Sequence, residues 1–353
     1  MYYSIRHQTR FRYSSPVSES IMEMRLQPRT EWTQHCLSFE IDLEPRTRVF
    51  HYRDYLGNTV HHFNVPGQHQ QLDIISTSLV EVNPFADWPM KLDATAWDEI
   101  DAQVNNGDYY EMLMPSDFAQ PTPALMELAA ALGIAPREDR REDRREDQCD
   151  DPMSLLRQLN TAIHRHFDYT PKATRVDSPI DEALRTGKGV CQDFAHVMIS
   201  LVRLLKIPCR YVSGYKAPRS GEGNLRAGER SGLASHAWVE AWLPGWGWVG
   251  FDPTNDELAS ERHIRTAVGR DYADVPPTKG LYKGESKGEL AVQVIVLQAD
   301  KPTNSEVELV FPSQDDEWTE TPRNERPSTE DGQSQQQQQQ SSTLRARRAS
   351  SIS

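Results

Sequence analysis

The sequence has few cysteines, no excess of basic residues and no long apolar run. Its 353 residues include only four cysteines, which are too scattered for a disulfide framework, so we expect free thiols. With a formal net charge of −13 the chain lacks the basic face that phosphate binding requires, and we expect no nucleic-acid partner. No apolar run of membrane-spanning length occurs, and residues 1–15 lack the apolar centre of a signal peptide. These absences predict a soluble, cytoplasmic protein with no membrane partner.

The N-terminal part of the chain alternates apolar and polar residues in the way that is typical of antiparallel β-strands. Residues 37–43 alternate strictly, and residues 56–60 are a candidate hairpin. We predict a β-sandwich domain over residues 1–83. His61 and His62 suggest a metal site, but adjacent strand residues point to opposite faces and no further ligand lies at a suitable spacing. We therefore predict no metal here.

Beyond this domain the composition divides the chain further. Residues 84–150 predict a helical connector that ends in a charged linker, in which the unit REDR recurs. Residues 151–300 have the mixed helix and strand periodicity of a second domain. Within it, the glycine-rich residues 216–235 form either a lid over a site or a tolerated surface insertion. Residues 301–353 are rich in Ser, Pro, Glu and Gln and cannot bury enough apolar surface to offset chain entropy, which predicts a disordered tail.

A glycine-containing turn, residues 187–190, precedes a cysteine on the first turn of a predicted helix. Apolar residues recur there at three- and four-residue spacing, at Cys191, Phe194, Ala195, Met198, Leu201, Val202 and Leu205. A thiol at a helix N-terminus lies at the positive end of the helix dipole, which favours the reactive thiolate. Cys191 is therefore a candidate nucleophile, although a lone cysteine in such a place is more often a small core residue.

A histidine opens the next informative element. Residues 236–243 alternate as a half-buried strand, and residues 246–251 follow a Pro–Gly turn as its hairpin partner. Asp252 closes the second strand, because the proline that follows cannot donate to a strand ladder. Cys191, His236 and Asp252 have the residue types of a nucleophile, a base and the group that orients the base.

These stretches carry a family resemblance. The segments GKGVCQDFAH, CRYVSGY and SHAWVEAWLPGWGWVGFDPTND resemble the core of the transglutaminase-like superfamily, and the match is close over about residues 150–300. The specific similarity is to bacterial transglutaminase-like cysteine proteases, in which a β-rich domain precedes the core. The resemblance implies an α+β fold with a papain-like core, in which the nucleophile helix packs on an antiparallel sheet. It also implies that Cys191 is the nucleophile, His236 the base and Asp252 its orienter.

The expected activity is acyl transfer through a Cys191 thioester, with a peptide or protein amide as the substrate. The backbone N–H of Cys191 can hold the oxyanion, and a second donor is normally needed. Candidates for oxyanion or substrate binding are Gln192, Tyr169, Tyr215 and Trp238.

Two outcomes for the thioester remain open. Water would make the protein a peptidase or amidase, whereas an amine would make it a transglutaminase that cross-links proteins. We favour hydrolysis, because the bacterial branch is described that way and the sequence has no acidic loop of the calcium-binding type. No metal or cofactor is expected. A non-catalytic binding module on the same fold is the competing class. Loss of a site residue would favour it, and all three are present.

Overall fold

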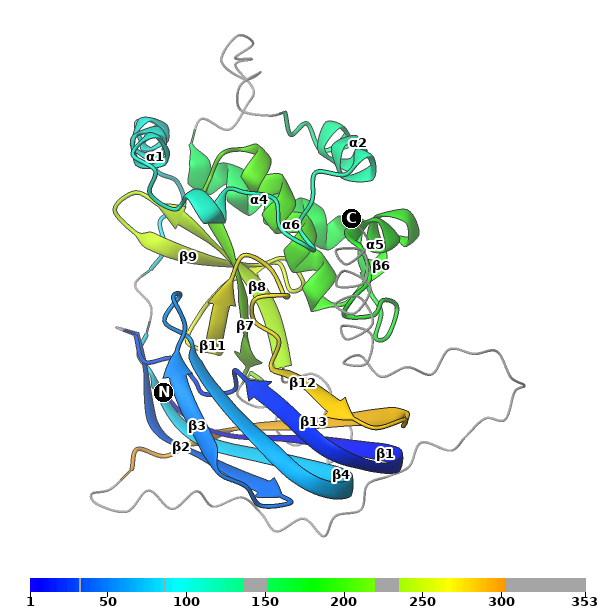
Figure 1. The fold of residues 1–353 in the computed structure, drawn as a ribbon. Helices are drawn as coiled ribbons and strands as arrows, with labels where there is room; N and C mark the ends of the chain where they lie inside the picture. The colour runs from blue at the N-terminus through cyan, green and yellow to red at the C-terminus, as the bar shows by residue number, and fades with distance from the viewer. Residues whose placement is uncertain (32, 85–86, 136–150, 220–234, 303–353) are drawn as a thin grey trace.

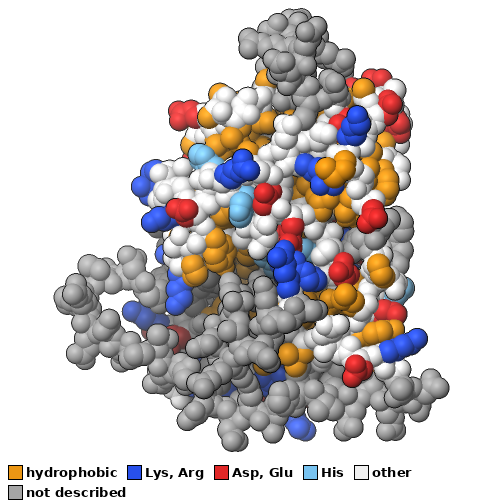
Figure 2. Space-filling view, turned by 180° about the vertical axis from the view of Figure 1, so that it is seen from behind, with side chains coloured by type: hydrophobic (Ala, Val, Ile, Leu, Met, Phe, Trp, Pro, Cys, Tyr) orange, Lys and Arg blue, Asp and Glu red, His pale blue; other side chains and the backbone are white. Residues whose placement is uncertain are grey.

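The computed structural model describes residues 1–302 apart from residues 32, 85–86, 136–150 and 220–234, and it has two parts that pack on one another (Figure 1). The REDR repeat, the glycine-rich segment and the predicted disordered tail lie almost entirely outside the described residues. Among the described residues, no helix is both long and apolar enough to cross a membrane. Acidic and basic side chains are interspersed over the face seen in Figure 2.

The first part is an antiparallel sheet of six strands: β1 (Tyr2–Met24), β2 (Gln34–Glu44), β3 (Val49–Arg53), β4 (Thr59–Val82), β12 (Thr278–Lys283) and β13 (Gly288–Ala299). Bulges near Val17 divide β1, whose first half pairs with β13 and whose second half pairs with β12. In the same way β4 pairs with β3 near its start and with β2 near its end. Both halves contribute to one hydrophobic cluster that includes Phe11, Met24, Phe63 and Ile74. The predicted sandwich is therefore one continuous sheet whose halves share a core.

Strands β12 and β13 correct the predicted domain boundaries. The sequence predicts a second domain over residues 151–300, but residues 288–299 of that range form β13, which pairs with β1. Its inward residues Val294 and Val296 lie in a cluster with Tyr3 and Ile5. The N-terminal domain thus includes residues 278–299. The sequence alone places these residues in the second domain, because alternation predicts a strand without predicting its partner.

The second part is a five-stranded antiparallel sheet with helices over one face (Figure 1). Its strand order is β10 (Glu257–Leu258), β9 (Gly247–Asp252), β8 (Ser235–Leu243), β7 (Cys209–Lys216) and β11 (His263–Gly269). The helices are α4 (Pro152–His166), α5 (Ile180–Thr186) and α6 (Cys191–Leu204), and the short parallel pair β5 (Asp168–Tyr169) and β6 (Lys188–Gly189) lies beside them. Helix α6 is buried on almost every side, because it lies between the sheet and helices α2 (Pro123–Ala131) and α4.

The connector belongs to the core of this second part. It holds α1 (Ala96–Asn105), the 3₁₀ turn η1 (Tyr110–Met112) and α2 (Pro123–Ala131). Ile100, Leu125 and Leu128 lie in the same hydrophobic cluster as α6. Thr122 caps α2, since its hydroxyl accepts a hydrogen bond from the Leu125 N–H.

Two buried carboxamides join the two parts at β11, the edge strand of the second sheet. The Gln34 side chain exchanges two hydrogen bonds with the backbone of Arg265, at 2.8 and 2.9 Å. Asn58 makes the same pair of bonds with the backbone of Val268, also at 2.8 and 2.9 Å. The N-terminal domain thereby satisfies backbone groups that an edge strand would otherwise leave unpaired.

Candidate active site

Cys191 is the first residue of α6, and its position is set by the residues around the turn before it. Gly187 ends α5 in the left-handed conformation with φ of 65°, which favours glycine. Gly189 packs so tightly that an added Cβ would lie 2.8 Å from the Asp193 side chain. The Asp193 carboxylate accepts hydrogen bonds from the Val190 N–H and the Thr174 hydroxyl. Asp193 therefore supports the N-terminal turn of the helix, and the Cys191 side chain is left partly exposed.

His236 and Asp252 come together across the β8–β9 hairpin. His236 lies near the start of β8 and Asp252 is the last residue of β9, and these antiparallel strands place the two residues at the same end of the sheet. His236 Nε2 donates to Asp252 Oδ2 at 2.7 Å, and the carboxylate is fully buried. The other ring nitrogen of His236 is available for the hydrogen bond with the Cys191 side chain.

The electrostatics of this pair favour a charged imidazole beside a charged carboxylate. Burial lowers the pKa of His236, but the Asp252 carboxylate and the hydrogen bonds with Asp252 and Cys191 outweigh it and raise the pKa to about 9. Burial likewise raises the pKa of Asp252, while His236, His263 and Lys216 together bring it well below its usual range. The site can therefore hold an imidazolium next to the thiol at neutral pH.

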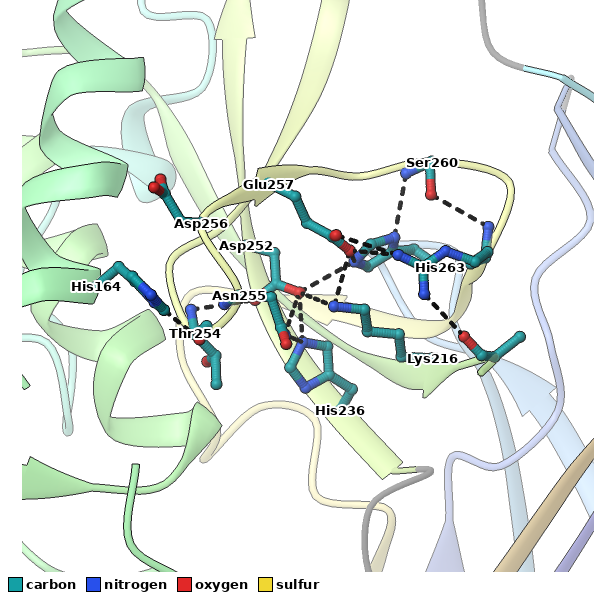
Figure 3. Close-up of polar contacts among 12 residues, drawn as sticks. His164, Lys216, His236, Asp252, Thr254, Asn255, Asp256, Glu257, Ser260 and His263 are labelled. Carbon is teal, nitrogen blue, oxygen red and sulfur yellow. Dashed lines mark hydrogen bonds and ion pairs between the residues drawn. The ribbon is translucent and has the colours of Figure 1, made fainter. Parts of the chain in front are cut away.

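Three further side chains, none of them among the predicted site residues, contact the same carboxylate oxygen (Figure 3). Asp252 Oδ2 accepts from Asn255 Nδ2 at 2.8 Å, from Lys216 Nζ at 3.0 Å and from His263 Nε2 at 3.1 Å. Asn255 follows Asp252 in the sequence by three residues, so a turn after the strand could have suggested it. Lys216 and His263 end and begin other strands, and no local pattern links them to Asp252.

The cluster of His236, Asp252 and His263 has the residue types of a metal site, because one ligand atom of each lies within 4.8 Å of the others. The contacts fit hydrogen bonding better. Both imidazoles reach the same oxygen as donors, and the Lys216 ammonium lies 3.0 Å from that oxygen, where it would repel a cation.

The remaining predicted residues have different surroundings. Tyr169 is 42% exposed and pairs in register with Gly189, and burial and then the nearby Cys191 raise its pKa. Tyr169 thus stays beside the cysteine as a candidate donor. Gln192 is 7% exposed and its side-chain N–H donates to the Val176 carbonyl at 2.9 Å, so this amide holds a neighbouring loop.

Tyr215 and Trp238 do not face a substrate, which corrects their assignment. The Tyr215 hydroxyl is buried against His7 Nδ1 at 2.9 Å, in the interface between the two parts. Trp238 is fully buried, and its ring packs against the rings of His236 and His263. Both faces of a central strand are covered here, so alternation could not show which of its side chains reach solvent.

Comparison with known proteins places both parts of the chain in one family. Residues 142–253 match the model of the transglutaminase-like superfamily, and residues 3–81 match the bacterial transglutaminase-like N-terminal region. An uncharacterized protein of Mycobacterium leprae is 33% identical over 288 residues, which cover 82% of this chain and 95% of that protein. A protein-glutamine gamma-glutamyltransferase of Pseudomonas aeruginosa is 34% identical over 140 residues, 37% of this chain and 20% of that enzyme.

Among solved structures, a candidate cysteine protease from Cytophaga hutchinsonii has a TM-score of 0.61 to this chain at 19% identity. The match covers 86% of this chain and 92% of the other. At this identity the likeness shows a shared fold. It extends over both the N-terminal sheet and the core.

Proposed function

Because the chain belongs to the transglutaminase-like superfamily, we propose that it is a cysteine-dependent enzyme that cleaves amide or peptide bonds through a thioester on Cys191. The observation that carries this proposal is the pairing of His236 with Asp252 at 2.7 Å, with the pKa of His236 raised to about 9. A base that is charged at neutral pH and sits beside a thiol stabilises the thiolate, which is the attacking species.

The reaction proceeds in balanced steps from these groups. The Cys191 thiol gives its proton to His236, and Asp252 stabilises the resulting imidazolium. The thiolate attacks the amide carbon, and the electron pair of the carbonyl moves to oxygen, near the N–H groups at the start of α6. When the intermediate collapses, the C–N bond breaks and the leaving amine takes the proton from His236. Water, deprotonated by His236, then attacks the thioester, releases the acid and restores the thiol.

Transfer to an amine is the second candidate, favoured by the name of the Pseudomonas aeruginosa relative. The two reactions share every step up to the thioester and differ only in what attacks it. A non-catalytic binding module on the same fold is the third, and the presence of all three site residues counts against it.

A substrate screen tests the proposal. Casein and dipeptide amides are incubated with and without a primary amine, and both the free acid and the amine-exchanged amide are followed. We expect the free acid to dominate, to disappear in Cys191→Ala and to persist in the matched control Cys36→Ala. Amine exchange that outpaces hydrolysis would move the function to cross-linking, and turnover in Cys191→Ala would refute the thioester mechanism.

A further inference from the structure

Four neighbouring strands bring polar side chains to one end of the second sheet. His263 begins β11 and faces Lys216, the last residue of β7, in the strand register. Gly214 of β7 pairs with His236 of β8, and Asp252 ends β9 next to it. The result is a single carboxylate oxygen, Asp252 Oδ2 on β9, that accepts hydrogen bonds from two imidazoles, His236 on the adjacent strand β8 and His263 on β11 beyond β7 (Figure 3).

The protonation of His263 follows from its two contacts. The Ser260 backbone N–H donates to His263 Nδ1 at 3.1 Å, so that nitrogen acts as an acceptor and carries no proton. The proton of a neutral ring must then be on Nε2, which lies 3.1 Å from Asp252 Oδ2 and donates to it. The loop at Ser260 thus selects the tautomer that presents an N–H to the carboxylate.

His263 cannot contact a substrate, because it is 1% exposed and covered by the Trp238 ring. Burial and the nearby charges of His236 and Lys216 lower its pKa, although Asp252 raises it, so His263 stays neutral while His236 is charged. The two imidazoles on one carboxylate therefore have different tasks.

We propose that His263 is a positioning residue, a neutral imidazole that holds Asp252 Oδ2 in line with His236 and keeps this carboxylate ionised for the cysteine site. This inference rests on the proposed function, since it assigns His263 a role in the Cys191 reaction. A carboxylate that accepts several hydrogen bonds is both fixed in orientation and more acidic.

The other charged groups at this end of the sheet have contacts that differ from those of His263. Lys216 Nζ divides its contacts between Asp252 at 3.0 Å and Glu257 Oε1 at 2.8 Å. Glu257 is also paired with Arg262 at 3.0 Å and with Arg219 at 3.4 Å, and it lies 3.7 Å from His263 Nε2. Lys216 is thus shared with a second carboxylate, whereas the His263 N–H points at Asp252.

The test compares two amides at position 263. In His263→Asn the side-chain oxygen can still accept from the Ser260 N–H, but the group is too short to reach Asp252. His263→Gln is longer and can place an N–H near the position of Nε2. Ser260→Ala is the matched control, because it keeps the backbone N–H that selects the tautomer.

The readout is the rate of Cys191 alkylation by iodoacetamide as a function of pH, with the modified residue mapped by mass spectrometry. We expect the acid limb of the His263→Asn profile to move up by about one pH unit, the size of one hydrogen bond to a charged group, so that the variant reacts about tenfold more slowly at pH values on that limb. His263→Gln should recover most of the rate, and Ser260→Ala should match the wild type. With a substrate in hand, kcat should fall in His263→Asn while KM stays unchanged.

A second measurement needs no variant. Nitrogen NMR shifts of ¹⁵N-histidine-labelled wild-type protein should show His263 as the neutral Nε2–H tautomer between pH 6 and 8. Three results would overturn the inference. Cys191 could label as fast in folded His263→Asn as in the wild type, or it could label slowly in both amide variants. The third such result is a His263 ring that is charged or carries its proton on Nδ1. If wild-type Cys191 labels no faster than Cys36, the proposed function itself fails.

Discussion

Replacing Asp252 by asparagine tests the site at its most connected atom. The asparagine side chain would have nearly the same shape but no charge, and its amide would meet N–H donors from His236, His263 and Lys216. The asparagine can accept hydrogen bonds from these donors only if its side-chain oxygen, and not its NH2 group, faces them. It cannot stabilise a positive charge on His236 as a carboxylate does.

The size of the effect follows from the pKa of His236. The site raises this pKa from 6.5 to about 9 against the opposing effect of burial, and Asp252 is the largest of the groups that raise it. Each pKa unit corresponds to about 1.4 kcal/mol, so the full shift is about 3 kcal/mol or roughly 300-fold in the protonation equilibrium. Because Cys191 contributes part of the shift, we expect Asp252→Asn to lose on the order of ten- to three-hundredfold in reactivity at pH 7.

The sign of the pH dependence is fixed by the same argument. Below about pH 9 the wild-type ring holds its proton, whereas in Asp252→Asn burial keeps the ring neutral at pH 7. The loss of Cys191 reactivity in Asp252→Asn should therefore be largest near neutral pH. The difference between the two proteins should become smaller above pH 9, where the His236 ring is neutral in both.

The assay is the pH–rate profile of Cys191 alkylation, followed by amide turnover once a substrate is found. The matched control is Asp256→Asn, which removes a charge from the same turn, where the Asp256 carboxylate accepts hydrogen bonds from the side chains of Asn160 and Thr161. Asparagine also tolerates the left-handed backbone of residue 256, where φ is 51°. Wild-type rates in a folded Asp252→Asn, or an equal loss in Asp256→Asn, would refute the reasoning.

Two further predictions concern the thiols and the junction of the two parts. Burial raises the pKa of both Cys36 and Cys209 to about 11, which leaves about three thiolates in ten thousand at pH 7.5. Iodoacetamide should therefore modify Cys191 first, and earlier labelling of Cys36, Cys149 or Cys209 would contradict the assignment. Asn58→Ala leaves the buried backbone N–H and carbonyl of Val268 without their partners and should lower the free energy of unfolding by about 2–4 kcal/mol in denaturant titration. The exposed control Asn64→Ala should change it by less than about 0.5 kcal/mol, and equal losses in the two variants would refute the role of the junction.

Much of the fold is legible in the sequence because it depends on local patterns. The three- and four-residue spacing after Cys191 predicts the helix that forms there, and the alternation from residue 236 predicts the strand. The proline and threonine at the start of α2 and the glycine after α5 likewise set helix ends through conformations that those residue types prefer.

What the sequence by itself determined is therefore the order of the elements and the three residues whose chemistry and strand positions suggest a site: Cys191, His236 and Asp252. Only the tertiary structure decided which strands pair, and this is why β13 lies beside β1 and why His263 and Lys216 meet Asp252. Strand pairing and the burial of one side of a strand depend on contacts between residues far apart in the chain. No local periodicity encodes such contacts, and so the second imidazole on the carboxylate could be found only after the sheet had been assembled.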